Sequence, residues 1–347
     1  MSDLLRRARE HEKAHLAAVD PAALPRWHVT GGVGWINDPN GFSLYKGEYH
    51  LFFQYNPYDT VWDTMHWGHI KSRDLIRWER LPAALAPDME YDRAGCFSGS
   101  GIELDDGRHL LVYTGVNKFS APDGTETELQ TQCLAIGDGT DYEKYAGNPV
   151  ITGADLPEGG SRKDFRDPKI WREDGKFYLV AGDRCPDGSG AILLYESEDA
   201  LRWHYAGTLA ESSNRYGRMW ECPDFFRLDG KDILLVSPQE MSPVGLEFHA
   251  GNGTAYIIGT FDPKTCHQVR ESVQAVDYGL DFYAPQTLET PDGRRVMIAW
   301  MQNWETVNCQ PRGIRYFGEM TLPRELSIRD GRLIQNPVRE LDKYRGY

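Results

Sequence analysis

The chain repeats one β-hairpin five times, and this repeat constrains the fold more than any other feature. In each copy an apolar segment reaches a corner made of a charged residue and a glycine, and a second apolar segment runs back. Glycine accepts the backbone angles that tight turns between antiparallel strands require. The five corners are Lys46-Gly47, Asp106-Gly107, Asp174-Gly175, Asp229-Gly230 and Asp292-Gly293.

This spacing predicts an all-β, five-bladed β-propeller. Hairpins that recur roughly every 55 to 70 residues are each too small to bury their own faces, and they become stable when they are arranged radially as blades. The first strand of each hairpin is then innermost. The expected hairpin strands cover residues 41–45 and 49–55, 98–104 and 109–114, 169–172 and 176–181, 224–228 and 233–237, and 286–289 and 295–300.

Polar residues recur in one phase of this repeat, about eight or nine residues before the corner glycine. We expect them at the start of each innermost strand, and the starts of these strands share one rim of the central channel. Residues far apart in the sequence should therefore converge on a carboxylate-lined funnel. The phased residues are Asp38, Ser98, Asp167 and Glu221, with Asp281, Tyr283 and Gln286 around the equivalent point of the fifth repeat.

The N-terminal segment differs from the repeats. Residues from Asp3 to about Val19 mix leucine and alanine with charged residues, which predicts a short helix that Pro21 and Pro25 end. We therefore divide the chain into an N-terminal helical extension, residues 1–25, and one propeller, residues 26–347. The helix is expected to pack against the outside of the propeller.

Charge and cysteine usage limit the partners and the compartment. A formal net charge of −14 argues against nucleic acid and anionic membranes, because binding a polyanion needs a basic face. The sequence has neither a signal-peptide core nor an apolar run long enough to span a bilayer. The six cysteines form no C-x-x-C pair, so we expect free thiols, no metal site and a cytoplasmic location.

Each phased carboxylate has a functional and a structural interpretation. Asp38 stands in a segment rich in Asn, Pro and Gly, which suits either a fixed catalytic side chain or an Asx turn. Glu221 follows a tryptophan and precedes a cysteine, surroundings that disfavour ionisation and favour a general acid over a strand-edge salt bridge. Arg166 should hold Asp167 ionised for hydrogen bonding to sugar hydroxyls, the alternative being a surface ion pair.

Two carboxylates with different environments in one concave site are the minimum machinery for glycoside hydrolysis, and a third can recognise hydroxyl groups. Aromatic rings near these segments suit the same substrates, because flat apolar rings contact the C–H faces of sugars. Individually such rings more often belong to a core. The candidates are Trp35, Trp62, Trp67, Phe97 and Trp304.

Seven motifs together resemble the invertase or β-fructofuranosidase family, glycoside hydrolase family 32, and the match spans from about Trp27 to Leu341 with the motifs in the right order. Chance production of all seven is negligible. They are Trp35-Ile36-Asn37-Asp38-Pro39-Asn40-Gly41, Phe53-Gln54-Tyr55-Asn56-Pro57, His66-Trp67-Gly68-His69, Cys96-Phe97-Ser98-Gly99-Ser100, Phe165-Arg166-Asp167-Pro168-Lys169, Glu221-Cys222-Pro223-Asp224 and Asp281-Phe282-Tyr283-Ala284-Pro285-Gln286.

The resemblance implies a five-bladed propeller that acts by retaining double displacement on a terminal β-fructofuranosyl unit, with no metal or organic cofactor. Asp38 matches the family's nucleophile, Glu221 its acid/base residue and Asp167 its transition-state stabiliser. Positions that match fructosyl-binding residues of the family are Asn37, Gln54, Trp62, Phe97, Ser98 and Arg166, and Trp67, Tyr283 and Trp304 are further candidates for substrate contact.

The sequence departs from the family pattern in three places. Ile36 stands where Met is usual and Gly101 where Ala is usual. Family members normally continue into a C-terminal β-sandwich, whereas this sequence ends at Tyr347, so we expect the sandwich to be lacking. The propeller surface that it normally covers would be exposed, which favours self-association as a homo-oligomer.

These observations predict a β-fructofuranosidase that hydrolyses sucrose or short fructo-oligosaccharides. A fructosyltransferase and a sucrose-6-phosphate hydrolase use the same machinery and stay open. An inverting propeller glycosidase on arabinose-type sugars would hold its carboxyls farther apart, and a noncatalytic sugar-binding propeller would lack activity.

Overall fold

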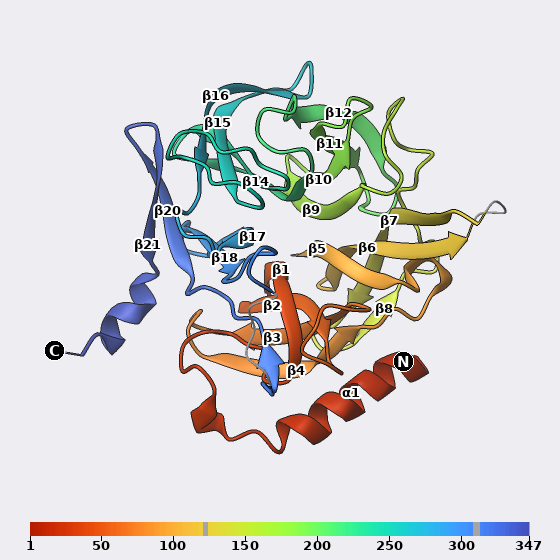
Figure 1. The fold of residues 1–347 in the computed structure, drawn as a ribbon, viewed down its shortest axis with the longest axis vertical. Helices are drawn as coiled ribbons and strands as arrows, with labels where there is room; N and C mark the ends of the chain where they lie inside the picture. Colours follow the sequence, from red (N-terminus) through yellow and green to blue (C-terminus); the bar gives the residue numbers. More distant parts are fainter. Residues whose placement is uncertain (121–123, 308–312, 347) are drawn as a thin grey trace.

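A computed structural model of the chain describes residues 1–120, 124–307 and 313–346. Five β-sheets are arranged radially around a central channel, which Figure 1 views end on. The predicted five-bladed propeller is therefore confirmed. In each blade the first strand along the chain lies at the channel, and the following strands lie successively further out.

The blades follow one another along the sequence. Blade I contains β1 (Gly34–Tyr45), β2 (Glu48–Asn56), β3 (His66–Ser72) and β4 (Trp78–Leu85), with β19 (Tyr316–Phe317) parallel to β1; blade II contains β5 (Gly95–Glu103), β6 (His109–Ser120), β7 (Glu126–Gly137) and β8 (Tyr142–Lys144). Blade III contains β9 (Arg166–Glu173), β10 (Lys176–Arg184), β11 (Gly190–Ser197) and β12 (His204–Glu211); blade IV contains β13 (Trp220–Leu228), β14 (Lys231–Pro238), β15 (Ala255–Asp262) and β16 (His267–Ala275). Blade V contains β17 (Tyr283–Glu289), β18 (Arg295–Trp300), β20 (Arg324–Arg329) and β21 (Arg332–Pro337).

The ring closes through its innermost strands. β1 contacts β5, β5 contacts β9, β9 contacts β13, β13 contacts β17, and β17 returns to β1. The apolar cores lie where neighbouring blades face one another; Phe52 of blade I, for example, packs with Leu111 and Tyr113 of blade II. Each blade thus buries its faces only against its neighbours, which is why the repeat needs closure.

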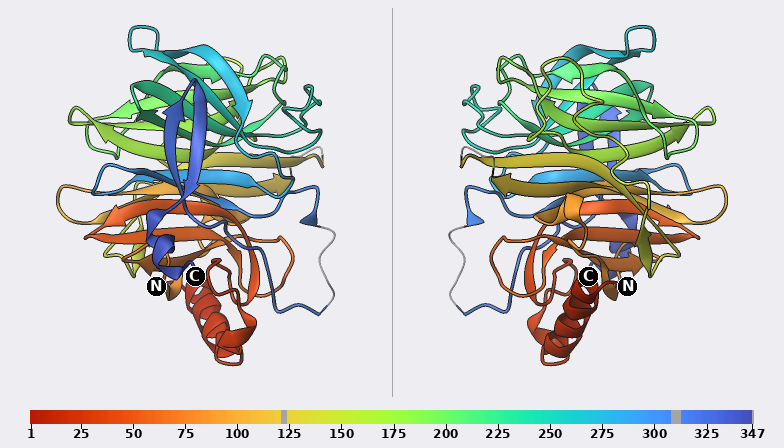
Figure 2. Two further views of the ribbon diagram at one scale, coloured as in Figure 1. Left: turned by 90° about the vertical axis from the view of Figure 1, so that its left-hand side faces the viewer. Right: turned by 90° about the vertical axis from the view of Figure 1, so that its right-hand side faces the viewer.

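The N-terminal helix is confirmed, although it ends earlier than expected. Helix α1 (Asp3–Leu16) begins after Ser2, whose hydroxyl accepts a hydrogen bond from the backbone N–H of Leu5. It lies along β4 outside blade I, where Glu12 accepts from the Ala83 N–H at 3.0 Å. Figure 2 shows the helix at one margin of the propeller, and the short helix η1 (Pro21–Ala23) follows it. The described residues also form the short helices η2 (Glu90–Asp92) and η4 (Arg339–Tyr344).

The innermost strands begin three to seven residues before the predicted ones, so that Asp167, Glu221 and Tyr283 stand at the first or second position of their strands, whereas Asp38 and Ser98 lie further inside β1 and β5. Every innermost strand pairs with its neighbour through a shift in register at this point. Such β-bulges re-aim side chains and are common beside active sites. The prediction that the phased residues mark strand starts is therefore confirmed for Asp167, Glu221 and Tyr283 and wrong for Asp38 and Ser98. All five lie in the bulged part of their strands.

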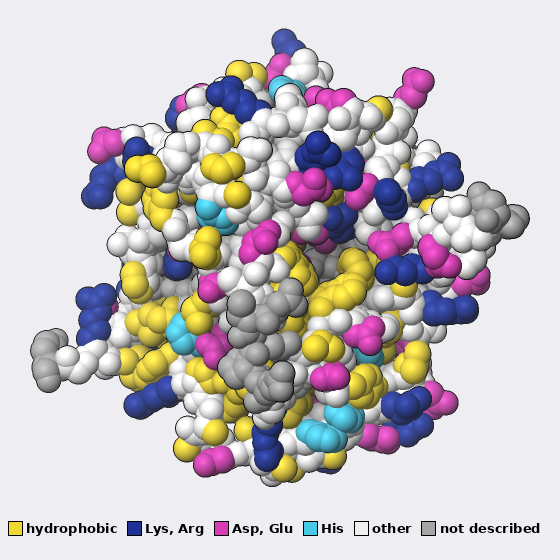
Figure 3. Space-filling view, in the orientation of Figure 1, with side chains coloured by type: hydrophobic (Ala, Val, Ile, Leu, Met, Phe, Trp, Pro, Cys, Tyr) yellow, Lys and Arg dark blue, Asp and Glu magenta, His cyan; other side chains and the backbone are white. Residues whose placement is uncertain are grey.

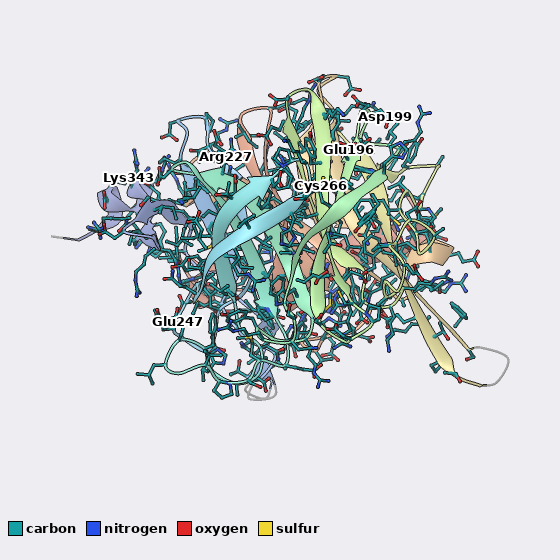
Figure 4. All side chains as sticks on the ribbon, turned by 90° about the horizontal axis from the view of Figure 1, so that it is seen from above. Glu196, Asp199, Arg227, Glu247, Cys266 and Lys343 are labelled. Carbon is teal, nitrogen blue, oxygen red and sulfur yellow. The ribbon has the colours of Figure 1, made fainter. Side chains whose placement is uncertain are left out.

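Figures 1 and 3 look at this face, whose centre is hollowed and bordered by acidic and apolar side chains. Figure 4 views the molecule from the side. It places Glu247, in the connection from β14 to β15, toward this face, and Arg227, near the far end of β13, toward the opposite face. In the described part of the chain, no helix has the length and apolar character needed to cross a membrane.

Candidate active site

Three carboxylates from three blades meet around one thiol at the centre of the hollowed face. The Cys222 Sγ lies 3.6 Å from the Asp38 Oδ2 and 3.5 Å from the Asp167 Oδ2. Glu221 precedes this cysteine on β13, and all four side chains are buried or nearly so. The phase of the repeat predicted that acidic residues of blades I, III and IV converge, and the structure brings Asp38, Asp167 and Glu221 to the channel.

One oxygen of Asp38 is held and the other is free of protein partners. Ser98 on β5 donates a hydrogen bond to the Asp38 Oδ2 at 2.7 Å. The Asp38 Oδ1 is buried and accepts no hydrogen bond. Burial and the neighbouring Glu221 charge raise the pKa of Asp38, while hydrogen bonds from Ser98 and Asn37 act in the opposite direction. The hydrogen bond from Ser98 thus fixes the orientation of the Asp38 carboxyl.

Arg166 holds Glu221, which corrects the expectation that it would hold Asp167. Its Nε and one terminal nitrogen donate to the Glu221 Oε1 at 2.9 and 2.8 Å. The Arg166 Nε is 4.0 Å from the nearest Asp167 oxygen. The surroundings of Glu221, expected from the sequence to be aromatic and weakly polar, therefore also contain a guanidinium that makes two charge-assisted hydrogen bonds to it.

The second oxygen of Glu221 also has two donors. The Tyr283 hydroxyl donates to the Glu221 Oε2 at 2.6 Å, and the Gln239 Nε2 donates to the same oxygen at 2.9 Å. Tyr283 comes from the first position of β17, whereas Gln239 follows the end of β14. Glu221 is therefore fixed from blades III, IV and V.

Asp167 is positioned by its backbone. It has a φ of 65°, a left-handed conformation that costs energy for a residue other than glycine. Its backbone N–H donates to the Thr114 Oγ1 at 2.9 Å, and its Oδ2 accepts from the Cys222 N–H at 2.9 Å. Burial raises the pKa of Asp167, since the favourable Arg166 charge does not offset burial and the carboxylates of Glu221 and Asp38.

Asp38 and Asp167 are both buried beside other carboxyl groups, and these surroundings raise the pKa of each. Within residues 1–120, 124–307 and 313–346, no cluster of three or more His, Cys, Asp or Glu side chains could hold a metal ion.

Four of the other predicted residues, Asn37, Gln54, Trp62 and Phe97, belong to blades I and II. Asn37 precedes Asp38 and accepts a hydrogen bond from the Trp35 indole at 2.8 Å. Gln54 on β2 donates to the Cys96 carbonyl oxygen at 3.0 Å. Trp62 lies in the connection from β2 to β3 with 41% of its surface exposed, and its ring meets Phe97 edge on at 5.9 Å between centroids.

Trp67 and Tyr283 are fully buried, so neither ring can present a face to a sugar. Trp67 belongs to the core between blades I and II, and its indole N–H donates to the Phe97 carbonyl oxygen at 3.1 Å. Its predicted substrate contact is therefore wrong, and it supports Phe97 instead. Tyr283 acts on Glu221 as described above. Trp304 is half-buried and packs against Trp300 and Trp35.

The sequence did not identify Gln239, Thr114 or the backbone of Cys222 as parts of the site. Gln239 and Thr114 lie on or after second strands of their hairpins, outside the phase in which the carboxylates recur. Cys222 has a φ of 49°, which turns its N–H toward Asp167. Only the position of Cys222 directly after Glu221 could have indicated a role.

Comparison with known proteins gives consistent matches over nearly the whole chain. Residues 28–337 match the model of the glycosyl hydrolases family 32 N-terminal domain. A raffinose invertase of Escherichia coli is 41% identical over 92% of this chain and 66% of its own length, and a sucrose-6-phosphate hydrolase of Zymomonas mobilis is 41% identical over 92% and 62%. The chain thus spans about two thirds or less of the length of these relatives.

Solved structures agree with these matches. A GH32 β-fructofuranosidase of Bombyx mori superposes with a TM-score of 0.88 at 39% identity, covering 99% of this chain and 71% of that one. A variant of the same protein in complex with sucrose gives the same values. A sucrose-6-phosphate hydrolase of Lactobacillus gasseri gives a TM-score of 0.81 at 30% identity, covering 96% and 67%.

Proposed function

Because the chain belongs to glycosyl hydrolase family 32, we propose that it hydrolyses terminal β-D-fructofuranosyl residues of sucrose or short fructo-oligosaccharides. The observation that carries the proposal is the buried meeting of Asp38, Asp167 and Glu221 around Cys222. Relatives named as a raffinose invertase and a β-fructofuranosidase support a fructosyl substrate.

In the first step a carboxylate oxygen of Asp38 attacks the anomeric carbon of the fructosyl unit. The Asp38 carboxyl suits the role because the hydrogen bond from Ser98 to its Oδ2 fixes the direction of the group. A bond forms between the Asp38 oxygen and the anomeric carbon, and the bond from that carbon to the leaving sugar's oxygen breaks. Glu221 gives its proton to the leaving oxygen, which departs as a hydroxyl group.

In the second step water releases fructose. Glu221, now ionised and stabilised by Arg166, takes a proton from the water as the water oxygen attacks the anomeric carbon. The bond to Asp38 breaks, and both carboxyls return to their starting states. Passage through a covalent fructosyl-enzyme predicts retention of configuration.

Asp167 supports both steps without reacting. Its Oδ2 is held by the Cys222 N–H, so the carboxylate is fixed beside the site of reaction. A fixed carboxylate there accepts hydrogen bonds from fructosyl hydroxyls and stabilises the positive charge that develops on the sugar in the transition state.

The direct test is release of fructose from sucrose by the wild type, Asp38→Ala and Glu221→Ala. We expect turnover only by the wild type, with the first-formed fructose as the β-anomer by NMR. A folded wild type that binds sucrose but is as inactive as both variants would instead support a noncatalytic sugar-binding propeller. Fructose appearing mainly on a sugar acceptor would support a fructosyltransferase.

Sucrose 6-phosphate is the second candidate substrate, because relatives from Zymomonas mobilis and Lactobacillus gasseri bear that activity in their names. The ratio of kcat/KM for the phosphorylated and free sugars decides between them. Kestose, inulin and levan in the same panel define the accepted chain length. The cytoplasmic location and the homo-oligomer stay predictions, and light scattering tests the second.

A further inference from the structure

We infer that Gln239 is a positioning residue that holds the ionised form of Glu221 and so sets the upper pH limit of activity. The inference rests on the proposed function, in which Glu221 must be protonated to start the reaction. Its basis is the hydrogen bond from the Gln239 Nε2 to the Glu221 Oε2 at 2.9 Å.

The backbone of Gln239 is fixed with respect to Glu221. Its N–H donates to the Met219 carbonyl oxygen at 2.8 Å, and its own carbonyl oxygen accepts from the Arg218 N–H at 2.9 Å. These bonds tie the end of β14 to the residues immediately before Glu221 on β13. Gly217, with a φ of 76°, allows this approach, because a Cβ there would lie 2.6 Å from the Gln239 carbonyl oxygen. The amide therefore reaches Glu221 from a clamped position.

The contacts of Glu221 match a carboxylate. A carboxylate offers about four lone-pair positions. Arg166 supplies two donors to the Oε1, and Tyr283 and Gln239 supply one each to the Oε2. All four positions are thus taken by donors when Glu221 is ionised.

Protonation of Glu221 changes which of these partners fits. The proton cannot lie on the Oε1, because Arg166 is a permanent donor and accepts no hydrogen bond. The proton must therefore lie on the Oε2. There the Tyr283 hydroxyl can accept it by turning its own hydrogen toward the Ser237 carbonyl oxygen, which lies 3.2 Å from the hydroxyl. With this proton shared with Tyr283, the Gln239 N–H is left with the remaining lone pair of a hydroxyl oxygen, which is a weaker acceptor than a carboxylate oxygen. The Gln239 N–H consequently favours the ionised state.

Three variants test this through the pH profile of kcat/KM for sucrose. Gln239→Met keeps the side-chain length and removes the donor, so the protonated acid is favoured and the basic limb moves up by about half a pH unit or more. Gln239→Glu keeps the size but adds a like charge, so the limb moves further in the same direction. Glu240→Gln is the matched control, because this neighbouring side chain is exposed and contacts Arg184 rather than Glu221.

A second readout separates positioning from a general loss of structure. Sucrose needs a proton on its leaving oxygen, whereas p-nitrophenyl β-D-fructofuranoside has a leaving group that departs without one. We expect Gln239→Met to change the ratio of kcat/KM for these two substrates, which a merely structural defect would leave constant. Should Gln239→Met not fold, the isosteric Gln239→Glu carries the test.

The inference is overturned if the basic limb of a folded Gln239 variant stays within 0.1 pH unit of the wild type, or moves to lower pH. Glu221→Gln distinguishes this from failure of the proposed function. If Glu221→Gln is inactive and the Gln239 limb is unmoved, only the role of Gln239 fails. If Glu221→Gln retains wild-type activity, the acid/base role and the inference built on it both fail.

Discussion

Replacing the buried His50 should reduce the amount by which the free energy of unfolding falls when the pH is lowered. His50 lies on β2 between blades I and II, 3% exposed, with its Nδ1 2.9 Å from the His69 Nε2. Burial lowers the pKa of His50 to about 4, an effect that the nearby Glu48 opposes and Lys71 reinforces. In the unfolded chain the same side chain titrates near its ordinary pKa of 6.5.

The sign and size of the effect follow from this difference. Above pH 6.5 His50 is neutral in both the folded and the unfolded protein, so its full contribution to the free energy of unfolding is present. Between pH 6.5 and about 4 only the unfolded protein binds the proton at this residue, and the free energy of unfolding therefore falls. The difference between these two pKa values, 6.5 and about 4, corresponds to roughly 3 kcal/mol when complete, and to roughly 2 kcal/mol between pH 7 and pH 5.

The assay is urea unfolding of the wild type and His50→Gln at pH 7, 6 and 5. Any direct damage by the substitution appears at pH 7 and cancels in the difference between pH values. We expect His50→Gln to lose roughly 2 kcal/mol less than the wild type between pH 7 and pH 5. His204→Gln, at an exposed position on β12, should lose as much as the wild type. Equal losses in the wild type and His50→Gln would refute the reasoning.

Three further substitutions test other contacts. Ser98→Ala removes the donor to Asp38 and should lower kcat/KM for sucrose by roughly 10- to 100-fold; an unchanged value would show that the 2.7 Å hydrogen bond does not position the carboxyl. The Lys169 Nζ lies 3.1 Å from the Asp224 Oδ2, so Lys169→Met leaves Asp224 as a buried unpaired charge and should lower the free energy of urea unfolding by about 3 to 5 kcal/mol. Removing both charges together should lower it less. Gly99→Ala places a Cβ 2.0 Å from a carbonyl oxygen of β6, so its thermal unfolding temperature should fall by several degrees, and an unchanged temperature would contradict this packing.

Much of the fold could be read from the sequence because its signals are local. The glycine corner at Asp174-Gly175 and the alternation of apolar residues beside it specify a hairpin without reference to distant residues. The inner strands extend further than predicted because the segment around Asp38 is rich in Asn, Pro and Gly, a composition typical of a turn. In the folded protein that segment is a bulge inside β1, held by pairing with β2.

The candidate site was only partly predictable. The phase of the repeat brought Asp38, Asp167 and Glu221 together, because a fixed offset within each blade becomes a fixed position around the channel. The phase of the repeat could not show which of Trp62 and Trp67 is exposed, since Trp62 lies just before β3 and Trp67 lies at its start. Their exposures, 41% and 0%, depend on whether blade II covers them.

The sequence by itself determined the number of blades and the three acids that face the channel, since strand pattern, turn chemistry and repeat phase are properties of short segments. Only the tertiary structure decided which charges pair and which groups assist. Arg166 is bonded to Asp167 along the chain yet donates to Glu221, and Gln239 reaches the same carboxylate from the end of another strand. Hydrogen bonds depend on distance and direction to within a few tenths of an ångström, and these are set only when five blades close on one another.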